Sequence, residues 1–111
     1  MGSILNDIKK LLGITEDYHA FDTDIIVHIN TTFSILNDMG IGPEKPFSIV
    51  NSENKWSEFI NDDETLLKVK TYIYLKVRLL FDPPQSSSVL EAYNNQIKEL
   101  EWRMYSKNDY I

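Results

Sequence analysis

The spacing of apolar residues along the chain predicts amphipathic helices, the first over residues 3–12. Ser3 is a suitable N-cap residue, and Gly13 follows the last apolar position, where a left-handed residue ends many helices. Lys9 and Lys10 lie in the last turn, where the helix dipole favours cations. The apolar residues recur at the helical period along one face: Ile4, Leu5, Ile8, Leu11 and Leu12.

A second helix is predicted from Asp22 to the glycine at position 40. Asp22 is the expected N-cap, and Phe21 and Ile26 have the spacing of a hydrophobic staple. The many β-branched residues in positions 24–32 make a strand a rival interpretation, but the 3.6-residue period favours a helix. The expected buried stripe shares that period: Ile25, Ile26, Ile29, Phe33, Leu36 and Met39.

Residues 46–56 have a different pattern. Phe47 and Ile49 alternate with polar neighbours, residues 51–54 are rich in turn formers, and Trp56 ends the segment. Alternation of this kind is typical of a short hairpin, and an ordered loop fits equally well. Residues 57–60, with Phe59 and Ile60, are expected to add one helical turn.

The third helix is predicted from an Asn61 N-cap to Asp82, where two prolines prevent its continuation. Its apolar residues cover nearly every side, which is typical of a helix buried all round. In so small a chain this indicates contact with other helices and also with a partner. The apolar residues form two stripes: Leu66, Val69, Ile73, Val77 and Leu80, and then Tyr72, Leu75 and Leu79.

A fourth helix is expected to begin at Ser88, whose spacing from Glu91 matches a capping box. Residues 106–111 form a polar tail that we expect to be unstructured. Residues 3–105 are therefore predicted to form one mainly α-helical domain, a small bundle of about four helices with a hairpin or ordered loop after the second. The stripe of the last helix has the same period as the others: Leu90, Tyr93, Ile97, Leu100 and Met104.

Composition narrows the possible functions. The chain has 111 residues, no cysteine and a formal charge of −6. The absence of cysteine excludes disulfides, thiolate metal sites and a cysteine nucleophile. An excess of acids disfavours a broad phosphate-binding surface. No targeting segment and no apolar run long enough to span a membrane is recognised, so no membrane association is expected.

Candidate chemistry is sparse, and we expect no enzyme, no catalytic residue, no metal and no cofactor. Asp24 and His28 share a helical face, with His19 and Asp22 nearby, but an evident third or fourth metal ligand is missing. Residues 61–64 resemble a cation cluster without the spacing of a calcium loop, so a charged helix start explains them. The serines at 86–88 lack the Gly-x-Ser-x-Gly context of a nucleophile, and capping accounts for them.

Basic residues on the third helix raise the possibility of DNA binding. They are scattered around the helix, and the short turn of a helix-turn-helix is missing. Solvated flanks of a buried helix explain them better, although a small helical DNA-binding regulator stays open as an alternative. The basic residues are Lys68, Lys70, Lys76 and Arg78.

Aromatic residues are more numerous than one small core needs. Tryptophan, tyrosine and arginine are the usual anchors of protein interfaces. Half-buried rim residues with hydrated polar tips are the plainer explanation. We expect self-association or docking to a partner, with six candidate contact residues: Trp56, Phe59, Tyr72, Tyr74, Trp102 and Arg103.

Several segments together resemble the head–tail connector (adaptor, DNA-packaging) proteins of long-tailed phages and prophages. In the second half these are KTYIYLKVRLLFDPP at 70–84, SSV at 87–89 and ELEWR at 99–103. In the first half they are HIN at 28–30, ILN at 35–37, GIGP at 40–43 and FSI at 47–49, followed by Trp56. The resemblance covers about residues 3–105 and lies in the order and spacing of these segments.

The resemblance implies a structural virion assembly protein and no catalysis. Such proteins attach beneath the portal protein at the capsid vertex as a twelve-fold ring, extend the DNA channel and give head-closure and tail proteins a docking platform. DNA would pass through without specific binding. The expected location is the virion, and the host cytoplasm during assembly. The isolated protein can be monomeric if the portal acts as template. A metal-dependent or small-molecule enzyme is the third, least supported class.

Overall fold

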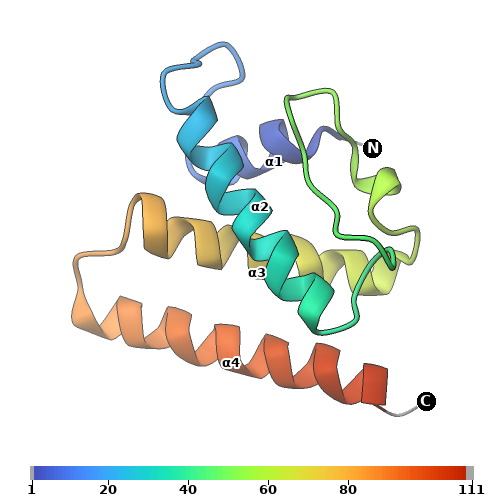
Figure 1. The fold of residues 1–111 in the computed structure, drawn as a ribbon. Helices are drawn as coiled ribbons and strands as arrows, with labels where there is room; N and C mark the ends of the chain where they lie inside the picture. The colour runs from blue at the N-terminus through green and yellow to red at the C-terminus, as the bar shows by residue number, and fades with distance from the viewer. Residues whose placement is uncertain (1, 110–111) are drawn as a thin grey trace.

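The computed structural model describes residues 2–109, and for residues 106–109 it describes the backbone alone. This part of the chain has four α-helices and one short 3₁₀ helix, and no strand (Figure 1). The all-α prediction is therefore confirmed. In chain order the elements are α1 (Ile4–Leu11), α2 (Asp22–Asp38), η1 (Trp56–Glu58), α3 (Asp63–Phe81) and α4 (Ser87–Asp109).

Helix α3 is the centre of the bundle. Helix α2 crosses it, α1 packs against both, and α4 runs antiparallel alongside α3 after a short connection (Figure 1). The core is contiguous and uses apolar side chains from every helix and from the 40–62 connection. Its members from α1, α2 and the connection are Ile4, Leu5, Ile8, Ile25, Ile29, Phe33, Leu36, Ile41, Ile49, Trp56 and Phe59. Those from α3 and α4 are Leu66, Val69, Tyr72, Ile73, Leu75, Val77, Ile97 and Met104.

The ends of α1 follow the sequence prediction. The Ser3 hydroxyl accepts a hydrogen bond from the backbone N–H of Asn6 at 3.1 Å, as an N-cap should. Gly13 has φ +84°, the left-handed conformation that ends a helix at low cost for glycine. Lys9 lies in the last turn, as expected, and is buried there, with 1% of its surface exposed.

The predicted N-caps of the other helices are each displaced. Phe21 occupies the N-cap position of α2, because the Asp22 carboxylate pairs with other side chains instead of the helix backbone. Asp62, and not Asn61, precedes α3, and its carboxylate accepts from the Thr65 hydroxyl. Helix α4 begins at Ser87, so the capping box predicted at Ser88 is wrong.

The C-terminal tail also differs from the prediction. Helix α4 continues to Asp109, so the backbone of residues 106–109 is helical and not unstructured. Residues 110–111 of the expected tail lie outside the described residues.

The connection between α2 and α3 is an ordered loop and not a hairpin. The Asn30 side chain donates to the Ile49 carbonyl at 3.0 Å and accepts from the Ile49 N–H at 2.8 Å. An isolated antiparallel bridge joins Ser3 to Lys55. Gly42 has φ +93°, and a Cβ there would lie 2.4 Å from the Phe59 ring. The loop is therefore fixed against α1, α2 and its own aromatic residue.

Candidate interaction surface

Three of the six residues expected at an interface lie in the core. Trp56 and Tyr72 are fully buried, and Phe59 is nearly so. The Trp56 indole N–H donates to the Asp7 carboxylate at 2.8 Å, and the Lys70 ammonium lies 5.3 Å from the ring centroid. Packing within the chain accounts for these residues, and their contact with a partner stays a prediction. An aromatic count cannot distinguish a large core residue from a surface anchor.

Tyr72 and Tyr74 join α3 to α4. The Tyr72 hydroxyl donates to Glu101 at 2.7 Å. Burial, the bond to Glu101 and its negative charge together raise the pKa of Tyr72 well above its usual value. Tyr74 is half-buried, and its hydroxyl accepts from Arg78 at 3.2 Å. Hydrogen bonding to Tyr74 also raises the pKa of Tyr93 on α4. Both tyrosines therefore hold the two helices together.

Trp102 and Arg103 lie on the surface. Trp102 is 69% exposed. The Arg103 guanidinium pairs with Glu99, one turn earlier, at 3.3 Å. An exposed tryptophan on an ordered helix is unusual for a monomer, because tryptophan side chains are on average mostly buried. These two stay predictions as contact residues, and Trp102 is the stronger of them.

A surface groove about 460 Å³ in volume lies between the C-terminal halves of α2 and α4, and Trp102 lines it. Its surface is mainly apolar, and Tyr105 beside Trp102 is also exposed. We call it the α2–α4 groove. This apolar hollow and the exposed rings of Trp102 and Tyr105 together make the groove a candidate interaction surface. The residues that line it are Ile35, Met39, Lys98, Glu101, Trp102 and Tyr105.

The basic residues of α3 all have partners within the chain. Lys68 lies 3.9 Å from Glu64, and Lys70 lies 3.7 Å from Asp7. The Lys76 ammonium lies 5.9 Å from the Tyr72 ring centroid, and Arg78 donates to the Asp82 carbonyl. Each basic side chain of α3 therefore has a contact within the chain, which explains it without a nucleic-acid ligand. Within residues 2–105, no observation favours a DNA-binding regulator over this explanation.

The candidate metal constellation is an ion-pair cluster. Asp22 lies 2.8 Å from the Lys9 ammonium and 2.9 Å from His19 Nδ1. Burial raises the pKa of Asp22, but the bonds from Lys9 and His19 outweigh it, so the net pKa lies below the usual value. Lys9 supplies the positive charge that a metal would bring. Within residues 2–105, no three candidate ligand side chains gather around a common point.

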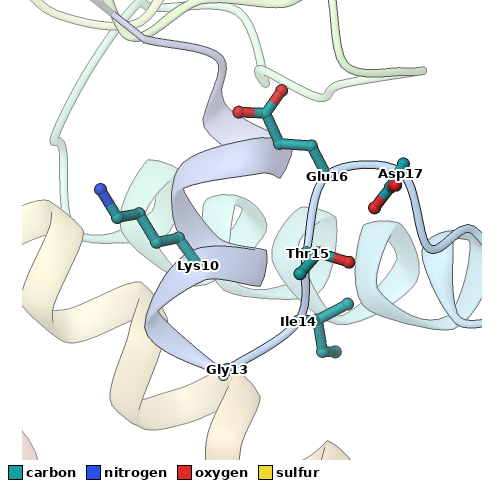
Figure 2. Close-up of a pocket in the computed structure, with 6 residues that line it drawn as sticks. All are labelled: Lys10, Gly13, Ile14, Thr15, Glu16 and Asp17. Atoms are coloured by element: carbon teal, nitrogen blue, oxygen red, sulfur yellow. The ribbon is translucent and has the colours of Figure 1, made fainter.

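A second hollow, about 510 Å³ in volume, lies beside the start of the connection from α1 to α2 (Figure 2). Figure 2 shows that the charged groups of Lys10, Glu16 and Asp17 do not converge on one point. A hydrogen bond from Thr15 lowers the pKa of Asp17. Ligand sites combine an apolar enclosure with converging polar groups. This hollow lacks the second element, so it is not a ligand site of that kind.

Comparison with known proteins identifies the family. A family model described as phage connector protein matches residues 4–111, nearly the whole chain. The chain belongs to the phage connector protein family. No curated protein and no solved structure matches it.

The resemblance read from the sequence is thereby confirmed. A phage connector is a structural component of the virion that interacts with other head or tail proteins. In the described part of this connector, no helix has the length and apolar character needed to cross a bilayer.

Sequence reasoning missed two features of this connector. One is Lys9, although its spacing from Leu5 and Leu12 already placed it on the apolar face of α1. The other is an aromatic cluster in which the Phe21 ring lies 5.7 Å from Tyr18 and 5.2 Å from Phe81. Tyr18 and Phe21 are exposed. Tyr18 lies in a polar connection, where no periodic pattern marks it.

Proposed function

We propose that this connector is a head–tail adaptor. Copies of the chain form a ring, twelve-fold like the portal, beneath the portal protein at the capsid vertex. The ring extends the DNA channel and gives head-closure and tail proteins a surface on which to dock. The family match over residues 4–111 is the observation that carries the proposal.

The exposed apolar residues support an assembly role. Trp102 and Tyr105 on α4 are largely exposed, and the α2–α4 groove between them and α2 is mainly apolar. Burying this apolar surface would lower the free energy of the protein, because apolar groups are more stable out of water. A monomer leaves that stabilisation unused. A subunit that meets neighbours would bury it on assembly, and a contact repeated around a closed rotation gives a ring.

The charge of the chain suits a DNA channel. Its net charge is −6, and the four cations of α3 are engaged within the chain. Acidic residues outnumber basic ones by seventeen to eleven, which disfavours a tight hold on phosphates, so DNA would pass without being held. This part of the proposal requires acidic side chains to face the lumen of the ring.

The role is mechanical. Helices α1, α2 and α3 and the 40–62 loop form a rigid body, while α4 presents exposed apolar residues for contact. Free chains in the host cytoplasm would be recruited to the vertex and become part of the virion. A weak contact between subunits suffices when the portal aligns twelve copies, because alignment raises their effective concentration.

The test is to mix the purified connector with purified portal protein and image the complex. We expect a ring of connector density coaxial with the portal and on its outer side. Portal imaged alone is the control for the position of that density. A connector that stays monomeric without affinity for the portal contradicts the proposal. Salt-dependent binding to duplex DNA would favour a regulator instead.

A further inference from the structure

The α2–α4 groove has a mainly apolar surface and two charged residues of opposite sign. Its apolar side chains are Ile35 and Met39 from the α2 side and Trp102 and Tyr105 from α4. Glu101 accepts a hydrogen bond from the Tyr72 hydroxyl at 2.7 Å and keeps its negative charge. Lys98 has no ion-pair partner among the side chains of residues 2–105. An apolar or aromatic group therefore fits the groove, and a carboxylate fits next to it at Lys98, away from Glu101.

The connection between α1 and α2 carries such a group. We call residues 13–21 the 13–21 loop; it projects from the molecule at the end where α2 begins (Figure 1). Tyr18 on this loop is 50% exposed, and the Phe21 ring lies beside it in a tilted arrangement. Asp17, next to Tyr18, is exposed and has no ion-pair partner among the same described side chains. An aromatic residue and a carboxylate thus adjoin on one projecting segment.

The loop is held in a fixed shape. The buried Lys9 ammonium donates to the carbonyl of Glu16 at 3.2 Å and to that of Tyr18 at 2.7 Å. It also pairs with Asp22 at 2.8 Å, which ties the loop to the start of α2. A segment ordered before binding loses less conformational entropy when it binds. The loop is accordingly ready for insertion without refolding.

The loop and the groove lie at different ends of the molecule. The loop precedes the N-terminus of α2, whereas the groove adjoins the C-terminal halves of α2 and α4 (Figure 1). One copy therefore cannot fill its own groove with its own loop. When two different surfaces of identical chains meet, the contact is heterologous and leaves one of each free for the next copy.

We propose that the 13–21 loop of one copy occupies the α2–α4 groove of the next, with Tyr18 against Trp102 and Asp17 facing Lys98. The occupant is a second copy of this chain because the loop carries an exposed aromatic ring that can pack on Trp102 and, next to it, a carboxylate that can pair with Lys98. The contact rests on the proposed adaptor function, and it assigns the surfaces through which neighbouring subunits meet.

Cysteine cross-linking tests the contact directly, since the natural chain contains no cysteine. Ala20→Cys marks the loop and Asn94→Cys marks α4 one turn before Lys98; both positions are exposed. Ser52→Cys, exposed on the 40–62 connection, is the matched control. The experiment uses the full chain, at high concentration and again bound to portal.

We expect mixed Ala20→Cys and Asn94→Cys chains to form disulfide dimers roughly tenfold faster than either variant alone, because contact raises the local thiol concentration. Mixed Ser52→Cys and Asn94→Cys chains should show no such enrichment. Equal rates for both mixtures, free and on the portal, overturn the contact. Preferential dimers of Asn94→Cys with itself also overturn it, since they indicate groove-to-groove pairing.

A charge reversal separates the specific pair from general apolar attraction. Asp17→Lys in the Ala20→Cys chain, or Lys98→Glu in the Asn94→Cys chain, should each slow cross-linking several-fold. Both together should restore the rate, and failure of that rescue overturns the Asp17–Lys98 pairing. A portal-bound ring without enriched cross-links leaves the adaptor role standing and refutes this contact. Enriched cross-links without portal binding support this contact and refute the adaptor role.

Discussion

Helices α3 and α4 are neighbours in the chain and in space, yet they are buried to very different extents. Helix α3 buries six side chains between Leu66 and Val77 and contacts α1, α2 and α4. Helix α4, although longer, buries only Ile97 and Met104 among its side chains up to residue 105. Helix α4 thus covers one side of a core that the rest of the chain builds, and it keeps an exposed face with Trp102. Our proposal assigns folding and assembly to different surfaces.

The two tryptophans give the sharpest test of this division. Trp56→Ala removes a fully buried ring and its bond to Asp7, so we expect a loss of about 3–5 kcal/mol in the free energy of unfolding. Trp102→Ala removes an exposed ring and should change that free energy by no more than about 0.5 kcal/mol. Urea denaturation followed by circular dichroism measures both, and similar losses for the two variants contradict the division.

The buried lysine gives the next largest effect. Lys9→Met leaves the Asp22 carboxylate and two loop carbonyls without their ammonium partner, and should cost about 3 kcal/mol. Its neighbour Lys10 is exposed, so Lys10→Met is a matched control with an expected change within about 0.5 kcal/mol. The same denaturation measurement applies. Equal stability of the two variants shows that Lys9 does not hold the 13–21 loop.

A smaller effect probes how α4 is attached. Tyr72→Phe keeps the buried ring but removes the hydroxyl that donates to Glu101, and should cost about 1–2 kcal/mol. Hydrogen exchange should rise more in α4 than in α1 or α2, because the bond joins α4 to α3. Tyr105→Phe, at an exposed position, is the control. An equal rise in hydrogen exchange in all four helices would contradict a specific role of this bond in holding α4 to α3.

The smallest effect is a pH dependence at the start of α2. Bonds from Lys9 and His19 hold the pKa of Asp22 below its usual 3.8. The stability that this carboxylate contributes is therefore present above pH 3.8 and is lost as the pH falls below that value. We expect the melting temperature of the natural chain to fall between pH 6 and pH 3 by about one or two degrees more than that of Asp22→Asn. Parallel curves contradict the ion pair.

The sequence was sufficient to predict the four helices and most of the core. The 3.6-residue period located α2 despite its β-branched residues, since Ile25, Ile29 and Phe33 are all buried on one face. Period is a strong signal because one face of a helix must be apolar for the chain to fold. The same reasoning failed for Leu80, which was assigned to a buried stripe and is exposed near the end of α3.

Helix starts and interface residues could not be predicted as well. Asp22 has the chemistry of an N-cap, but a lysine from another helix competes for its carboxylate, and only the fold brings the two together. Likewise, nothing in the local sequence distinguishes the buried Trp56 from the exposed Trp102. Whether a tryptophan is covered depends on long-range packing, which local pattern does not encode.

The most direct measurement of the central claim is the attachment of the Trp102→Ala variant to portal. Purified variant and natural chain are titrated against the same portal preparation, and bound connector is quantified after sedimentation. We predict that the variant retains the natural melting temperature but requires much higher concentration to attach. Attachment at the natural concentration would contradict the assignment of α4 to assembly.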